Sequence, residues 1–135
     1  MVTKLERFRP AAALIARLVL GSIMLAHGWM KVIPRGSLYS FAHTVAHMGL
    51  PYWLGYLAAF TEFFGGIALI LGILTPITAI AVAIDMAVAI VKVHLRHGLT
   101  GPGGFEFPLS LFALALLLLA DGPGFLALDR VLFRG

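Results

Sequence analysis

The stretch that decides the fold is PYWLGYLAAFTEFFGGIALILGILTPITAIAVAIDMAVAIVKVH, residues 51–94. It contains two apolar runs, 51–74 and 76–94, each about as long as a helix must be to cross the hydrocarbon core of a bilayer. Only Thr75 and its neighbours separate the runs, so the two helices must form a tight antiparallel hairpin. The stretch therefore predicts two adjacent membrane-spanning helices.

The composition of the whole chain also indicates a lipid environment. The chain has 135 residues, of which 61% are hydrophobic and 12% are charged, and its mean hydropathy is +1.00. Soluble domains usually carry about 25% charged residues. A soluble fold of this length could not hide so much apolar surface, because small domains leave a large fraction of their surface exposed. We therefore expect one integral membrane domain, residues 1–135.

Two further apolar runs, about 10–33 and 105–120, bring the prediction to an all-α membrane protein with a four-helix bundle. Basic residues precede the first run, an arrangement that is also typical of a cleaved signal peptide. Arg17 interrupts that run and more spans follow it, so we interpret it as an uncleaved helix. The last run has Pro108 in its first turn, where proline is tolerated, and at about 24 Å it is the shortest span.

Two amphipathic segments are predicted outside the spans. In residues 37–48 apolar side chains recur at helical spacing, which predicts a short helix on the membrane surface; the alternative is an ordered loop. The tail, 125–134, is also amphipathic, and we expect it at the interface. The glycine-rich loop 98–104 follows no strand and has no P-loop lysine pattern, so phosphate binding is not expected there.

The distribution of charge suits a lipid surface. The net charge is +4, but the ten Lys and Arg lie singly or in pairs beside the apolar runs, which argues against a nucleic-acid partner. Four spans place both termini on one side, and the small excess of basic residues there, five against four, favours cytoplasmic termini. The chain has no cysteine, which excludes disulfides, thiol redox chemistry and thiolate metal sites.

Three ionisable residues, Arg17, Glu62 and Asp85, lie well inside the apolar runs. At about 1.5 Å per residue they fall within roughly one helical turn of the same depth. A charge at the bilayer centre costs about 2.5 to 3.5 kcal/mol, so we expect the three side chains to face inward and meet. With two acids and one arginine, one carboxyl is expected to hold a proton, because burial disfavours the charged form. Such a carboxyl suits a proton donor or a hydrogen-bonding partner of a quinone-like head group; the alternative is an ion-pair network that only fixes helix packing.

Further polar residues extend from this depth towards the side away from the termini, which we call the outer face. On the first span, His27 and Lys31 continue the stripe that begins at Arg17. On the third span, Asp85 and Lys92 are seven residues apart and share a face. For the two lysines the alternative is snorkelling to the interface. The candidate cofactor-binding residues are His27, Trp29, Lys31 and Lys92.

Histidines on the outer face raise the question of a metal. His43 and His47 are four residues apart, the spacing of two ligands on one helix face, and His94 and His97 end the third span nearby. Exposed interfacial histidines are far commoner than ligands, so no metal ligand is assigned and a haem or metal cofactor is not favoured.

Four segments resemble the DoxX family of small bacterial membrane proteins and occur in the order expected for it. They are RLVLGSIMLAHGWMKV (17–32), GLP (49–51), EFFGGIALILGILTP (62–76) and GPGFLALD (122–129). The matching positions are Arg17, His27, Gly28, Lys31, Glu62, Gly65 and Gly66. The resemblance implies a four-helix protein of the bacterial inner membrane, associated with redox systems such as thiosulfate:quinone oxidoreductase. It also implies that any cofactor is a quinone or belongs to a partner protein.

Two functions follow as alternatives. The first is a membrane subunit or accessory of a redox complex, quinone-linked or concerned with oxidative stress, in which Arg17, Glu62 and Asp85 handle a quinone-like head group or its proton. The second is a non-catalytic membrane anchor, assembly partner or small-molecule carrier. A homo-oligomer is compatible with both, and whether the chain is itself an enzyme stays open.

Overall fold

The computed structural model describes residues 2–133, and over these residues the chain is helical with no strand. The helices are α1 (Val2–Glu6), α2 (Arg9–Val32), α3 (Ser37–His47), α4 (Tyr52–Leu71), α5 (Thr75–Ala89), the π-helical turn η1 (Ile90–His94), the 3-10 turn η2 (Leu95–His97), α6 (Glu106–Asp121) and α7 (Asp129–Leu132). The all-helical prediction is confirmed.

Three of these elements are long and apolar enough to cross a membrane: α2, α4, and α5 together with the two turns that continue it to His97. Their outward faces carry large apolar side chains, for example Ile15, Leu57, Phe64 and Ile84, each more than half exposed. Lipid can cover such a surface, whereas water cannot do so without cost. The α6 helix has 16 residues and is shorter than these three.

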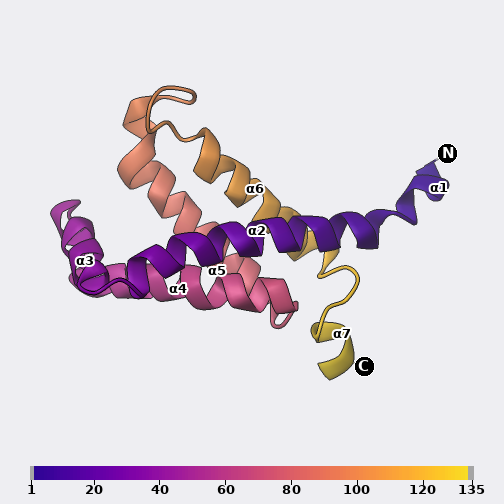
Figure 1. Cartoon of the computed structure of the whole chain (residues 1–135). Coiled ribbons are helices and arrows are strands. Elements are labelled where there is room, and N and C mark those ends of the chain that lie inside the picture. The colour runs from indigo at the N-terminus through magenta and orange to yellow at the C-terminus, as the bar shows by residue number, and fades with distance from the viewer. Residues whose placement is uncertain (1, 134–135) are drawn as a thin grey trace.

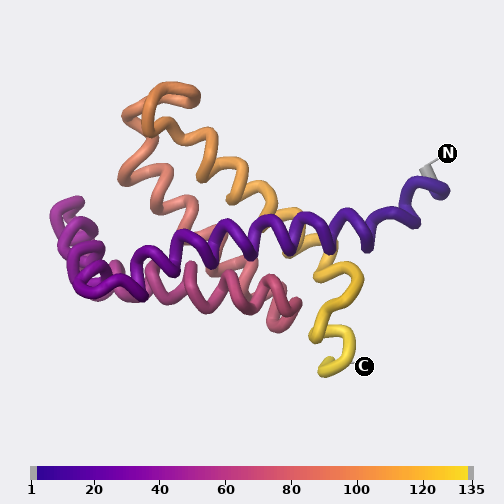
Figure 2. Tube along the Cα trace, in the orientation of Figure 1, coloured from indigo at the N-terminus to yellow at the C-terminus, as the bar shows by residue number. Residues whose placement is uncertain are grey.

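The helices form two antiparallel pairs (Figure 1). The α2 and α4 helices run side by side, and α5 and α6 form a second pair that crosses them and diverges from them at the end that carries η1. The core lies where the pairs cross and contains Leu20, Met24, Leu69, Val82 and Leu118. The two ends of the described chain lie toward the same end of the bundle (Figure 2).

Glycines let α2 and α4 approach closely. A methyl group at Gly28 would overlap the backbone of Phe63, and one at Gly66 would overlap the backbone of Leu25. Small residues at such contacts allow helix backbones to pack against each other. This contact sets the register of the pair, and with it which polar side chains of the two helices can meet.

Residues 37–47 form the helix α3, within one residue of the predicted 37–48 segment and in place of the alternative loop. Its Ala42 is fully buried against α4, where a methyl group at Gly55 would come within 2.6 Å of the Ala42 Cα. The α3 helix therefore lies across the first turns of α4 and covers one end of the bundle, as Figure 1 shows.

Candidate functional site

Arg17 does not meet Glu62 or Asp85, so the predicted three-residue cluster is wrong in this respect. The arginine side chain is fully buried, and its guanidinium donates to four backbone carbonyl oxygens. These belong to Leu69, Ile70, Phe125 and Leu126, at 3.1, 3.3, 2.9 and 3.1 Å. The reason is the register of the α2–α4 pair: Arg17, early in α2, lies opposite the last turn of α4, about 10 Å along that helix from Glu62.

Arg17 instead holds the C-terminal segment in place. The last carbonyls of a helix have no partner within the helix, and at the end of α4 the guanidinium supplies donors for two of them. The same segment places the Asp129 carboxylate at the start of α5, where it accepts from the backbone N–H groups of Leu74 and Thr75 at 2.5 and 2.8 Å. The predicted interfacial tail thus docks, over its described part, on the turn between α4 and α5.

A partly buried ion pair joins Lys31 and Glu62. The Lys31 Nζ lies 2.6 Å from Glu62 Oε2, and the side chains of the lysine and the glutamate are 25% and 6% exposed. Lys31 also lies over the ring of Phe41, 4.4 Å from its centroid, a cation–π contact from α3. Lys31 therefore turns inward to a partner instead of extending to the interface.

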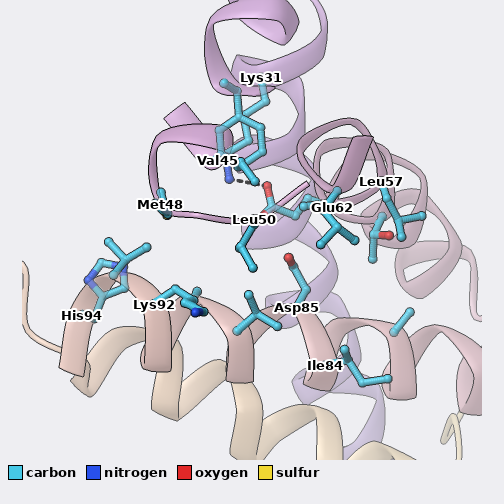
Figure 3. A pocket seen from close by; sticks show the side chains of 18 residues that line it. Lys31, Val45, Met48, Leu50, Leu57, Glu62, Ile84, Asp85, Lys92 and His94 are labelled. Atoms are coloured by element: carbon cyan, nitrogen blue, oxygen red, sulfur yellow. Dashed lines mark hydrogen bonds and ion pairs between the residues drawn. The ribbon is translucent and has the colours of Figure 1, made fainter. Parts of the chain in front are cut away.

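This ion pair forms part of the wall of a cavity of about 480 Å³ between α3, α4 and the α5–η1 segment. Most of the wall is apolar; its charged and titratable residues are Lys31, Glu62, Asp85, Lys92 and His94. Figure 3 shows the Glu62 and Asp85 carboxyl groups pointing into the space between α4 and α5 from facing helices. The Asp85 Oδ2 is buried and has no hydrogen-bond partner among the described residues. The structure thus brings together two of the three residues predicted to meet.

The cavity borders an exposed apolar surface of the bundle. Three of its lining residues, Leu57, Ile84 and Val88, are 55%, 60% and 42% exposed and belong to helices long enough to span a membrane.

Two of the four candidate cofactor-binding residues lie outside this cavity. His27 is exposed and packs against the ring of Phe107 on α6, at 5.7 Å between centroids. Trp29 is 53% exposed and lies 6.1 Å from the ring of Phe63. Gly28 makes the close backbone contact with α4, while its neighbours pack elsewhere: His27 against α6 and Trp29 against the ring of Phe63 on α4. Lys31 and Lys92 do line the cavity, as predicted for one polar track.

The sequence indicates His94 only as a possible metal ligand. In the structure this residue lines the cavity. Among residues 2–133, no three His, Cys, Asp or Glu side chains come together as a metal-ligand set. His43 packs instead on the rings of Tyr39 and Tyr52, with centroid distances of 4.3 and 5.5 Å. The π-helical turn that carries His94 has no signal in the hydrophobic pattern, which is why the sequence missed it.

Comparisons with a family model and with curated proteins both find relatives of this chain. The DoxX family model matches residues 12–95. The chain is 31% identical over 122 residues to the protein named "Putative oxidoreductase CatD" of Bacillus subtilis (strain 168), covering 90% of this chain and 87% of that protein. It is 26% identical over 139 residues to "Inner membrane protein YqjF" of Escherichia coli (strain K12), covering 95% and 97%. No solved structure matches.

Proposed function

Because the chain belongs to the DoxX family of membrane proteins, we propose that it is a membrane component of an oxidoreductase system whose cavity binds a quinone-like head group. The observation that carries the proposal is the Asp85 carboxyl group, which lines a largely apolar cavity and whose buried Oδ2 has no hydrogen-bond partner among the described residues. The name of the Bacillus subtilis relative supports the oxidoreductase part of the proposal.

The chemistry of the cavity fits such a ligand. Its volume, about 480 Å³, lies in the usual range of small-molecule pockets, about 300–1,000 Å³. Asp85 lines the cavity, so its carboxyl group can form a hydrogen bond with a ligand oxygen there. Its buried Oδ2 lacks a partner at a cost of about 1–3 kcal/mol, so the site is not optimised for the stability of the protein alone. Protonated Asp85 donates to a carbonyl oxygen, and ionised Asp85 accepts from a hydroxyl, so the same residue can bind either form of the ring and exchange its proton.

The role of the Lys31–Glu62 pair follows from its position beside Asp85. The ammonium group neutralises Glu62 at 2.6 Å and holds its carboxylate in place. The quinone, when bound, supplies the electron chemistry, while these side chains bind and orient its ring and hold or release a proton at Asp85. Arg17 lies at the far side of the α2–α4 contact and takes no part in binding the ligand.

The test is to look for bound quinone in protein purified in a mild detergent. The wild-type chain is expected to retain quinone or to bind an added short-chain ubiquinone. Asp85→Leu removes the unpartnered oxygen at similar volume, so we expect it to lose the ligand while its thermal unfolding temperature stays equal or rises. Glu62→Gln leaves the Lys31 charge without its carboxylate, so we expect a lower unfolding temperature.

Two results would decide against this function. Wild-type protein that neither retains nor binds ubiquinone contradicts it directly. Copurification of a soluble enzyme in fixed proportion, without a lipid cofactor, would favour the alternative of a non-catalytic anchor, assembly partner or carrier. A protein partner found together with bound quinone supports the complex that we propose.

The arrangement in the membrane is proposed on the same basis. The α6 helix contacts α5 and α2 and exposes Phe107, Leu116 and Leu117, which supports a fourth, short span. At about 24 Å it falls short of the hydrocarbon core, which the bilayer can accommodate by thinning. We further propose the bacterial inner membrane as its location, cytoplasmic termini, and an interfacial position for α3.

A further inference from the structure

The α5 helix, which lines the cavity from Ala81 to Ala89, continues into a π-helical turn, η1, that lines one end of the cavity. In η1 the backbone N–H of Leu95 donates to the carbonyl of Ile90, five residues earlier. Such turns are rare and are frequent at functional sites. Lys92 lies seven residues after Asp85, on the helix face that already lines the cavity, whereas His94 falls outside that regular spacing and lines the cavity from within the π-helical turn. The helix face and the turn together place a lysine and a histidine at one end of the cavity.

The glycine-rich loop fixes the tautomer of His94. The imidazole Nδ1 lies 2.7 Å from the carbonyl oxygen of Gly103. A carbonyl can only accept, so Nδ1 carries the hydrogen, and in the neutral ring the lone pair is then on Nε2. Because His94 lines the cavity, Nε2 of its neutral ring is the nitrogen left to accept a hydrogen bond from a ligand there.

Lys92 complements this acceptor with a donor. Its ammonium has no ion-pair or hydrogen-bond partner within residues 2–133. Figure 3 shows Lys92 and His94 on the same stretch of the cavity wall, with Asp85 further along it. Asp85 precedes Lys92 by seven residues, about 10 Å along the helix. That separation is comparable to the length of a para-substituted ring with a hydrogen bond at each of its two oxygens.

We propose that Lys92 and His94 form a hydroxyl-binding subsite, and that the cavity binds the reduced quinol form of the head group in preference to the quinone. The inference rests on the proposed function and adds to it the form of the ligand. Lys92 donates to the oxygen of either form. Nε2 of His94 accepts only from a hydroxyl, which the quinol has and the quinone lacks.

The experiment measures the affinities of the full chain, purified in detergent, for a short-chain ubiquinol and for the matching ubiquinone under anaerobic conditions. Wild-type protein is expected to bind the quinol about fivefold more tightly, the effect of one neutral hydrogen bond. In His94→Asn the amide can keep the bond to Gly103 but the Nε2 acceptor is lost, so we expect the preference to disappear through weaker quinol binding alone. Lys92→Met should weaken both ligands equally.

His97→Asn is the matched control, because this neighbouring histidine does not line the cavity; it should leave both affinities unchanged. Equal wild-type affinity for quinol and quinone overturns the subsite but leaves the proposed function standing. Wild-type protein that binds neither ligand overturns both. If His94→Asn weakens the binding of quinone as much as the binding of quinol, His94 acts through the structure of the loop. In that case Nε2 is not the acceptor for the quinol hydroxyl.

Discussion

The buried guanidinium of Arg17 is held by backbone carbonyl oxygens and not by an acidic side chain, and its Nε has no partner among the described residues. All four of its hydrogen bonds go to backbone carbonyl oxygens, two at the end of α4 and two in the segment before α7. The planar guanidinium can serve several acceptors at fixed angles, which a lysine ammonium cannot do in the same geometry. Gly72, with φ of +70°, leaves the space that this group fills.

Replacing Arg17 is therefore expected to destabilise the fold and to release the C-terminal segment. Arg17→Met removes the donor shared by the end of α4 and the segment before α7, and we expect a loss of about 2–4 kcal/mol, with Arg17→Lys intermediate. Thermal unfolding in detergent measures the loss, and limited proteolysis measures the release of residues 125–133. Arg7→Met, at an exposed site, is the control. An unchanged unfolding temperature and unchanged proteolysis in Arg17→Met would show that the hydrogen bonds of Arg17 contribute nothing to the stability of the fold.

At the scale of elements, the contact between α2 and α4 determines which polar residues meet. The close approach at Gly28 and Gly66 sets Lys31 opposite Glu62 and Arg17 opposite the end of α4. From the sequence, the depths of Arg17 and Glu62 were counted from helix ends, and that count carried no information on how the two helices are aligned. The shared face of Asp85 and Lys92 was predictable because both lie on one helix.

Two adjacent glycines provide a matched test of this contact. A methyl group at Gly66 would overlap the backbone of Leu25, whereas one at Gly65 would lie 3.4 Å from Thr78 Cγ2, an ordinary contact. We expect Gly66→Ala to cost about 1–3 kcal/mol of stability, measured by thermal unfolding, and Gly65→Ala to be nearly neutral. Equal effects of the two substitutions would mean that the close approach of α2 and α4 does not limit stability.

At the scale of the whole molecule, α3, α4 and the α5–η1 segment line the cavity. The two ends of the described chain lie together at the end of the bundle away from α3. An ion pair between Arg9 and Asp121 joins the start of α2 to the end of α6 at the terminal end. If α6 spans the membrane, the glycine-rich loop and the C-terminal segment lie on opposite sides of it. The cavity end with His94 then faces outward in our proposal.

This topology can be tested with single introduced cysteines, because the chain has no cysteine of its own that would also be labelled. Thr100→Cys places a thiol in the glycine-rich loop, and Leu132→Cys places one in α7; both sites are exposed. A membrane-impermeant maleimide is added to intact spheroplasts. We expect it to label the thiol at position 100 directly, and to label the thiol at position 132 only after the spheroplasts are lysed. Labelling of both sites from the same side would show that α6 does not cross.

Some features of this protein depend on the sequence alone. The apolar runs require helices in lipid, because no other local structure satisfies the backbone of a long apolar segment, and the family follows from the same segments. Tertiary structure alone decided the partners of the buried charges. Arg17 binds carbonyls and Lys31 binds Glu62 because glycine contacts set the register between helices distant in sequence. It also decided that His94 lines the cavity, since a π-helical turn and a loop carbonyl orient its ring.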